Sequence, residues 1–384
     1  MSEWKEYKLG EIVTRITSGG TPKSSEASYY DGDIPWLNTK EINFNRITKT
    51  ERCITQEGLN NSSAKWIPKG AVIVAMYGAT AAKVAYSLID LTTNQACCNL
   101  IIKESVADSR FVYYYIQSSY EELLNLACGA AQQNLSLGVI ADFPISLPSL
   151  DDQHRIASIL TSLDDKIDLL RRENATLEAM AETLFRQWFV EEAKEDDVAL
   201  GDVIKTTSGG TPSRKCAEYY ENGTICWVKS KELDGSFISS TEELITEDAV
   251  SNSSAKRLPE KSVLIAMYGA TVGEYGILSK SMTCNQAVCA LIPNENYPFT
   301  YLFVWAASMK QEFINLATGA AQQNISQDLI KQQYVSSDVG KIKEYDNRVR
   351  SLFDKIENNQ KQIQTLIQTR DGLLPRLMSN EIKI

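Results

Sequence analysis

The chain repeats itself once, and this duplication constrains its fold more than any other feature. Ser18-Gly-Gly-Thr-Pro22 recurs as Ser208-Gly-Gly-Thr-Pro212, and Ala75-Met-Tyr-Gly-Ala-Thr80 recurs as Ala266-Met-Tyr-Gly-Ala-Thr271. The separation stays at 190 or 191 residues over more than 100 positions. This period is far longer than the roughly 20–50 residues of solenoid repeats. The 384-residue chain is therefore predicted to contain two copies of one domain.

Each copy is predicted to be a mixed α/β domain. Short apolar runs at 72–77 and 96–102, repeated at 263–268 and 287–292, are typical of buried strands. Segments 110–127 and 300–317 have helical spacing of apolar residues. The Gly-Gly-Thr-Pro segments are predicted turns, because Gly supplies positive φ and Pro fixes φ.

A heptad pattern of apolar residues follows each copy and predicts a long helix there. The predicted core positions are Leu160, Leu163, Ile167, Leu170, Leu177, Leu184, Val349, Leu352, Ile356, Ile363, Leu366 and Leu373. Asn174 and Asn359 occupy core slots, where a buried Asn fixes register. The alternative is a local slip that exposes both. Aromatic residues at 185, 188 and 189 either dock a partner or pack on a globule.

The predicted fold class is α+β: two similar mixed α/β domains separated by two long helices that form an antiparallel, pseudo-two-fold coiled coil. The predicted boundaries are 1–150 and 197–339 for the globular domains, and 151–196 and 340–384 for the helices. Residues 151–197 carry 6 basic and 13 acidic side chains, whereas residues 340–384 carry 9 and 6, which favours their pairing. Two similar bodies at a fixed separation suit a two-fold symmetric ligand such as duplex DNA.

Composition excludes several classes of function. The net charge of −10 argues against a nucleic-acid partner, but most of it lies in the first helical segment. With His154 the only histidine, a Cys/His zinc site is not expected, and no metal or cofactor is predicted. No methyltransferase, Walker or nuclease signature occurs, so no catalytic residue is predicted. No apolar run approaches the roughly 18 residues of a membrane span, and a cytoplasmic location is predicted.

The chain resembles the DNA-specificity (S) subunits of type I restriction-modification systems. The matching pieces are Leu9-Gly-Glu-Ile12, the Gly-Gly-Thr-Pro loop with its following Tyr-Tyr, the strand ending in Tyr-Gly-Ala-Thr, the Gln-Gln-Asn-Leu-Ser136 segment, and Pro148 to Ile156 opening a long helix. The second copy departs at 335–342, which lacks the Pro and the Gln and leaves the start of its helix open.

The resemblance implies that each globule is a target-recognition domain for one half of a split site in double-stranded DNA. The helices would set the half-site spacing and dock two adenine-methyltransferase subunits, with restriction subunits joining them. The chain itself would do no chemistry. The alternative is a duplicated protein–protein scaffold without DNA recognition.

Candidate DNA contacts lie in loops that recur in both copies or differ between them. They are Gly19, Gly20, Thr21, Lys23, Lys40, Arg46, Lys65, Tyr77, Gly209, Gly210, Thr211, Arg214, Lys215, Lys231, Lys256 and Tyr268. The glycine loops could present N–H and hydroxyl groups to phosphates, although a tight turn alone is the favoured interpretation. For the lysines, phosphate contact and a solvated surface position are weighed equally. Packing is the favoured role for the two tyrosines, and Trp36 and Trp227 are predicted core residues.

Residues that differ between the copies are the better candidates for reading bases. Segments 23–26 and 213–216 form one such pair, and 43–46 and 234–237 form another. The repeated amides Gln132, Gln133 and Asn134 are assigned a structural role. Because the copies are so alike, two similar, inverted half-sites are expected.

Overall fold

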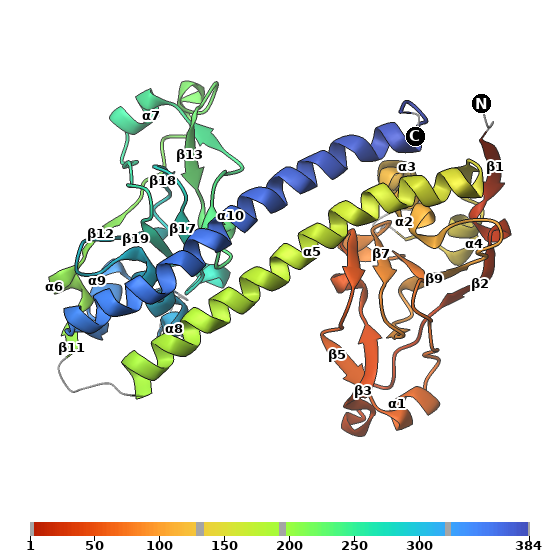
Figure 1. Ribbon diagram of the computed structural model, residues 1–384, viewed down its shortest axis with the longest axis horizontal. Coiled ribbons are helices and arrows are strands. Elements are labelled where there is room, and N and C mark those ends of the chain that lie inside the picture. Colours follow the sequence, from red (N-terminus) through yellow and green to blue (C-terminus); the bar gives the residue numbers. More distant parts are fainter. Residues whose placement is uncertain (1–3, 128–133, 192–196, 319–323, 383–384) are drawn as a thin grey trace. The chain divides into compact units, whose positions relative to one another are not determined.

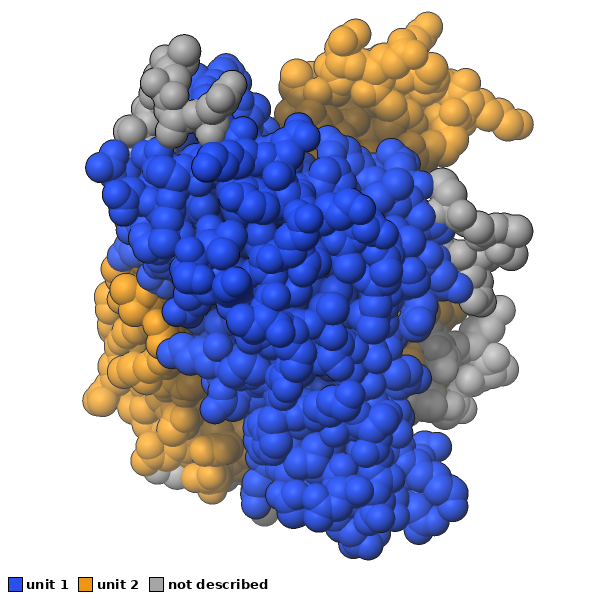
Figure 2. Space-filling model, turned by 90° about the vertical axis from the view of Figure 1, so that its right-hand side faces the viewer, with its two compact units in different colours: residues 1–167, 365–384 blue, residues 168–364 orange. Residues whose placement is uncertain are grey.

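The computed structural model describes residues 4–127, 134–191, 197–318 and 324–382. They fall into two compact units, coloured separately in Figure 2. Unit 1 comprises Met1–Ile167 with Thr365–Ile384, and unit 2 comprises Asp168–Gln364. Each unit therefore holds one globular domain together with parts of both long helices, α5 (Leu150–Arg186) and α10 (Val339–Met378).

The first domain is built on a mixed sheet flanked by short helices (Figure 1). Its main sheet has the order β2 (Val13–Ser18), β9 (Cys97–Ile102), β6 (Val72–Ala75), β7 (Val84–Ser87), β4 (Asn45–Ile47). A smaller sheet has the order β5 (Arg52–Ile54), β3 (Tyr30–Leu37), β8 (Thr92–Thr93), and β1 (Lys5–Lys8) pairs with β10 (Pro144–Leu147). The helices are α1 (Gln56–Asn60), α2 (Ser109–Ser118), α3 (Tyr120–Asn125) and α4 (Leu137–Ala141).

The second domain repeats this topology strand for strand. Its main sheet has the order β12 (Lys205–Ser208), β19 (Val288–Ile292), β16 (Val263–Ala266), β17 (Tyr275–Leu278), β14 (Phe237–Ile238). Its smaller sheet is β15 (Leu244–Ile245), β13 (Ile225–Val228), β18 (Thr283–Cys284), and β11 (Asp197–Ala199) pairs with β20 (Tyr334–Ser336). The helices are α6 (Leu200–Val203), α7 (Glu247–Ser251), α8 (Phe299–Thr318) and α9 (Gln327–Lys331). The predicted duplication is confirmed.

The cores form where the sequence predicts buried strands. All four residues of β6 and of β16 are buried. One predicted helix differs, because 110–127 breaks at Ser119, which adopts φ −96° and ψ 19° between α2 and α3. Tyr120, directly after the break, packs its ring edge-on against Phe44 at 5.1 Å. The equivalent helix α8 runs unbroken.

Both long helices begin at equivalent residues, which settles the question left open for the second. The Ser149 hydroxyl accepts a hydrogen bond from the Asp152 amide at 3.2 Å in α5. In α10 the Asp338 carboxylate accepts from the Lys341 amide at 2.9 Å. Asp338 thus caps the second helix without the Pro and Gln of the first copy.

The helices pair antiparallel within unit 2. The Tyr345 hydroxyl donates to the carbonyl of Ala181 at 3.1 Å, while Asn359 Nδ2 donates to Asn174 Oδ1 at 2.8 Å. Of the predicted core positions, Leu160, Ile167, Leu170, Val349 and Ile356 are buried and the others are half-buried. The two asparagines are buried against each other, so the alternative of a local slip that exposes both is wrong.

The end of α5 and the residues after it carry several aromatic side chains, which pack on the second domain and on α10. Phe185 lies 5.4 Å from Tyr301 and 5.9 Å from Tyr345, ring centre to ring centre, and Phe189 lies 5.0 Å from Tyr301. These contacts match the predicted packing on a globule. Within the described ranges, no helix has the length and apolar character to cross a bilayer.

Candidate nucleic-acid interface

The Gly-Gly-Thr-Pro loop is packed tightly against the domain that carries it. The Gly20 amide donates to the carbonyl of Thr93 at 2.8 Å, and the Gly210 amide donates to that of Cys284 at 2.9 Å. A Cβ atom at Gly20 would lie 2.2 Å from the Ala64 nitrogen. Gly19 meets the backbone of residues 93 and 94 equally closely, and Gly209 meets that of 284 and 285. The glycines are therefore required for packing, and the amides at 20 and 210 already donate inside the domain.

A Tyr–Trp pair lies beneath each loop and holds it from below. In the first domain Trp36 Nε1 donates to the carbonyl of Gly20 at 3.0 Å, and the Tyr30 hydroxyl donates to that of Pro22 at 2.6 Å. In the second, Trp227 and Tyr220 make the same bonds at the same distances. Both tryptophans are buried, as predicted. The loop is thereby fixed so that only its threonine, Thr21 or Thr211, is exposed.

Exposed polar residues continue from this threonine along the ends of the central strands. Thr21 Oγ1 donates to Gln95, and the neighbouring Ala96 carbonyl accepts from the Met76 amide at 2.8 Å. Tyr77 follows directly and pairs with Asn134 in a β-bridge. We call this set the exposed ridge; it comprises Thr21, Gln95, Tyr77 and Asn134 in the first domain, and Thr211, Gln286, Tyr268 and Asn324 in the second. All are exposed except Asn324, which is half-buried.

The exposure of the two ridge tyrosines differs from the expectation that they are packing residues. Tyr77 and Tyr268 are each 42% exposed. Gly78, which follows, has φ +74° and nothing within 4 Å of its would-be Cβ atom, so the glycine serves the turn. Gln132 and Gln133, like Gln322 and Gln323 of the second copy, lie outside the described residues. Gln95 and Gln286 were not among the predicted site residues. Their recurrence in the repeated Asn-Gln-Ala segment is the sequence signal that could have identified them.

The repeated lysines lie around the loops but differ in their partners. Lys40 pairs with Glu51 at 2.5 Å, and this bond raises the pKa of the lysine. Lys231 pairs with Glu242 at 2.6 Å. Lys256 Nζ donates to the Thr207 hydroxyl at 3.1 Å.

The other predicted cations are also at the surface. Lys65 is exposed, directly after the residues that Gly20 touches. Lys23 is exposed and pairs with Glu26 at 3.0 Å, and Lys215 is exposed. The recurring glutamates show that Lys40 and Lys231 are held in place rather than freely solvated.

Arg46 does not lie on this surface. Its guanidinium is 9% exposed and pairs with Asp165 of helix α5 at 2.6 Å. The equivalent part of the second copy behaves alike, because the Phe237 amide donates to Gln360 of α10 at 3.1 Å. Arg46 and Phe237 therefore contact the long helices, whereas Asn43 and Asp234 at the other ends of the two segments are exposed.

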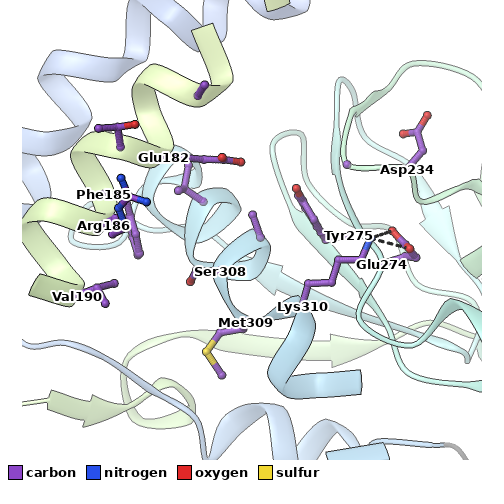
Figure 3. A pocket seen from close by; sticks show the side chains of 15 residues that line it. Glu182, Phe185, Arg186, Val190, Asp234, Glu274, Tyr275, Ser308, Met309 and Lys310 are labelled. Carbon is purple, nitrogen blue, oxygen red and sulfur yellow. Dashed lines mark hydrogen bonds and ion pairs between the residues drawn. The ribbon is translucent and has the colours of Figure 1, made fainter. Parts of the chain in front are cut away.

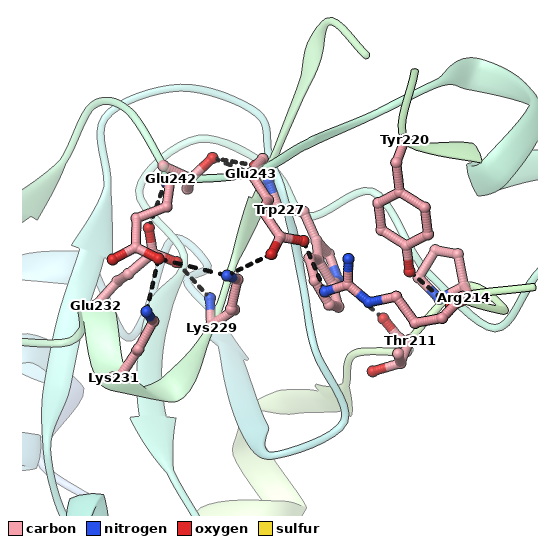
Figure 4. A network of polar contacts seen from close by, with 12 residues as sticks. Thr211, Arg214, Tyr220, Trp227, Lys229, Lys231, Glu232, Glu242 and Glu243 are labelled. Atoms are coloured by element: carbon pink, nitrogen blue, oxygen red, sulfur yellow. Dashed lines mark hydrogen bonds and ion pairs between the residues drawn. The ribbon is translucent and has the colours of Figure 1, made fainter. Parts of the chain in front are cut away.

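An arginine missed by the sequence reasoning lies over the aromatic pair of the first domain. The Arg52 guanidinium is 4.6 Å from the centre of the Tyr30 ring. In the second domain Arg214 lies 4.3 Å from the Tyr220 ring and pairs with Glu243 at 2.7 Å (Figure 4). Glu243 also accepts from Lys229 at 2.8 Å. Arg52 could have been found by comparing the copies, since its equivalent position holds Glu243.

A pocket of about 710 Å³ lies elsewhere in unit 2, between α5, α8 and β17 (Figure 3). Gly235, which lines it, stands where the first copy has Phe44. Glu182, Tyr275 and the Lys310–Glu274 pair line it, and none of them was a predicted site residue. In the part of the chain that the structure covers, no group of three or more His, Cys, Asp or Glu is arranged for a metal ion.

The chain carries two equivalent polar surfaces, one on each domain. Each domain has the equivalent main sheet and is followed by a long helix, and these features define a protein with two similar binding domains. Comparison with known proteins identifies its kind. The chain belongs to the family of the type I restriction modification DNA specificity domain, whose model matches residues 1–179 and 193–365.

Relatives align with this chain over all or nearly all of their length. The type I restriction enzyme MjaIX specificity subunit of Methanocaldococcus jannaschii is 28% identical over 100% of this chain and 97% of its own. The HindI specificity subunit of Haemophilus influenzae is 22% identical, with 100% of both chains covered. The crystal structure of a type I restriction-modification S subunit from M. genitalium shares the fold, with a TM-score of 0.62 at 16% identity over 98% of this chain and 96% of that one.

Proposed function

We propose that each globular domain reads one half of a bipartite DNA site and that the exposed ridge forms the reading surface. The observation that carries this proposal is the duplication of the ridge: the same four residue types occur at the same places in both domains. Hydroxyls and amides are groups that hydrogen-bond to base edges and phosphates, and Tyr adds an exposed ring. Lys65 and Lys256 beside the ridge supply a salt-dependent contribution to affinity.

In this proposal the paired helices set the distance between the half-sites. They also dock two adenine-methyltransferase subunits, and restriction subunits act on the same complex. The chain contributes no chemical step of its own. The family to which it belongs favours this role over that of a protein–protein scaffold without DNA recognition.

The likeness of the two surfaces supports two similar half-sites in inverted orientation, separated by an unspecific middle. Tyr268 and Tyr77 have the same exposure, and the loops next to them have the same bonds. Inverted half-sites mirror the two-fold arrangement of their reader.

Methylation sequencing of a host that carries the chain with its methyltransferase tests this proposal. We expect modified adenines in two related, inverted sequences at one fixed spacing, which disappear when the chain is deleted. A matched gel-shift series on that site should weaken linearly in log affinity as log salt rises. Two unrelated half-sequences would reject the quasi-palindrome, and unchanged methylation on deletion would reject DNA reading itself.

A further inference from the structure

The Tyr–Trp pair beneath each loop carries an arginine on its exposed side. Arg214 lies 4.3 Å from the ring centre of Tyr220 and 5.3 Å from that of Trp227. Arg52 lies 4.6 Å from the ring centre of Tyr30. Because Tyr30 and Tyr220 are equivalent residues, both domains present a guanidinium over the same ring.

The two arginines nevertheless come from different positions in the repeat. The residue equivalent to Arg214 in the first copy is Ser24, and the residue equivalent to Arg52 in the second is Glu243. The first domain thus supplies the cation from strand β5, whereas the second supplies it from the loop after the Gly-Gly-Thr-Pro motif. A carboxylate occupies the second domain's equivalent of the β5 position. A cation over an exposed ring stabilises a fold only weakly, so stability gives little reason to keep a cation at this place in both domains.

Both guanidiniums have donors that remain available. Arg52 is exposed, and within the described part of the chain no carboxylate lies within ion-pair distance of it. The Arg214 side chain is 56% exposed, and it bonds to Glu243 (Figure 4) through Nη2. Stacking on a ring fixes the plane of a guanidinium and leaves its edge free to donate.

The arginines also lie next to the exposed ridge. The Tyr30 hydroxyl is bonded to Pro22, and Thr21 of the ridge precedes that proline. The same holds for Tyr220, Pro212 and Thr211. A duplex lying along the ridge would therefore have the guanidinium edge within its reach.

Building on the proposed function, we infer that Arg52 and Arg214 are specificity-determining residues, each reading one guanine by donating to its O6 and N7 atoms. This bidentate contact is the commonest specific contact of arginine in the major groove. Since the rings beneath the arginines are equivalent, the two guanines occupy equivalent places in the inverted half-sites. Glu243 holds Arg214 in one orientation, so the second domain discriminates more sharply at its guanine than the first does.

The primary test measures methylation by the complete complex on duplexes in which each base pair of the site is changed in turn. Arg52→Ala should lower the preference for guanine at one position of the first half-site by roughly 10- to 100-fold and leave the second half-site unchanged. Arg214→Ala should do the same in the second half-site alone. Arg52→Lys, which keeps the charge without the planar fork, should lose the preference but retain the salt dependence of binding.

An exchange variant checks that the guanidinium, and not a local distortion, is responsible. Arg52→Glu alone should abolish the guanine preference of the first domain. Adding Ser24→Arg recreates the arrangement of the second domain and should restore it. Arg257→Ala, which removes an exposed arginine paired with Glu247 outside this cluster, is the matched control and should leave both preferences intact.

Several outcomes would overturn the assignment. Uniform weakening on every duplex would make the arginines phosphate contacts, and an unaltered preference in Arg52→Ala and Arg214→Ala would leave them without a reading role. Failure of Ser24→Arg to rescue Arg52→Glu would also reject it. In all three cases the bipartite site of the unaltered complex would persist, whereas loss of the proposed function would show as no sequence-specific methylation by the unaltered complex.

Discussion

Replacing the buried asparagine pair of the coiled coil should separate stability from register. Asn359 donates to Asn174 at 2.8 Å and to Glu173 at 2.9 Å, and both asparagines are buried. Asn359→Leu would leave the Asn174 Oδ1 acceptor without its donor in an apolar interior, which costs about 1–3 kcal/mol. Urea unfolding of the chain in its complex, followed by the helical circular dichroism signal, should show this loss.

The double variant Asn174→Leu/Asn359→Leu should behave oppositely. Asn359 Oδ1 is buried with no hydrogen-bond partner within the described ranges, so the pair is incompletely satisfied. Two leucines remove that unmet acceptor and bury more apolar surface, for an expected gain of about 1–2 kcal/mol over the unaltered chain. The variant should also lose the single register, seen as a second spacer length among methylated sites.

Ile356→Val serves as the control for this experiment. It lies one turn from Asn359 and is buried, and it should cost about 1 kcal/mol without a second spacer length. A double variant as unstable as Asn359→Leu, or one that keeps a single spacer length, would refute the reasoning.

Three further substitutions test single features. Burial, together with the charges of Glu182 and Asp234, raises the pKa of Glu178 from 4.5 to about 7, so stability falls as pH rises between those values. Glu178→Gln should therefore add about 1–2 kcal/mol at pH 8 and nothing near pH 4, compared by urea unfolding. Gly20→Ala should destabilise the first domain by about 2–4 kcal/mol in the same assay, because its Cβ would meet the backbone. Arg46→Ala should lower stability but leave DNA affinity in a gel shift unchanged; weaker DNA binding at equal folding would contradict its placement.

The sequence predicts features that depend on pattern and fails where tertiary contact decides. Duplication, the β6 and β16 strands and the heptad core follow from spacing alone, and all are present. Arg46 was misjudged because its partner Asp165 lies 119 residues away, on a helix whose position over β4 no local pattern reveals. The ion pair of Lys40 could have been predicted in part, since Glu51 recurs as Glu242 at the same offset as Lys40 and Lys231.

The candidate site shows the same division. The loops and their threonines were found because they recur. The glycines were assigned to a tight turn with positive φ, whereas the structure shows that close packing requires them. Arg52 was missed because it is not equivalent to Arg214 in the repeat. Only the structure shows that the two arginines lie over equivalent rings, those of Tyr30 and Tyr220.

Unit 1 is not continuous in the chain, and this affects its biosynthesis. Leu374, Leu377 and Met378 belong to the same apolar core as Phe111 and Leu123 of the first domain. The ribosome releases residues 1–167 long before residue 374 exists, so the nascent first domain emerges with part of its core uncovered. Folding chaperones should therefore stay bound to it until translation has passed the second domain, and ribosomes stalled before residue 365 should carry a protease-sensitive intermediate.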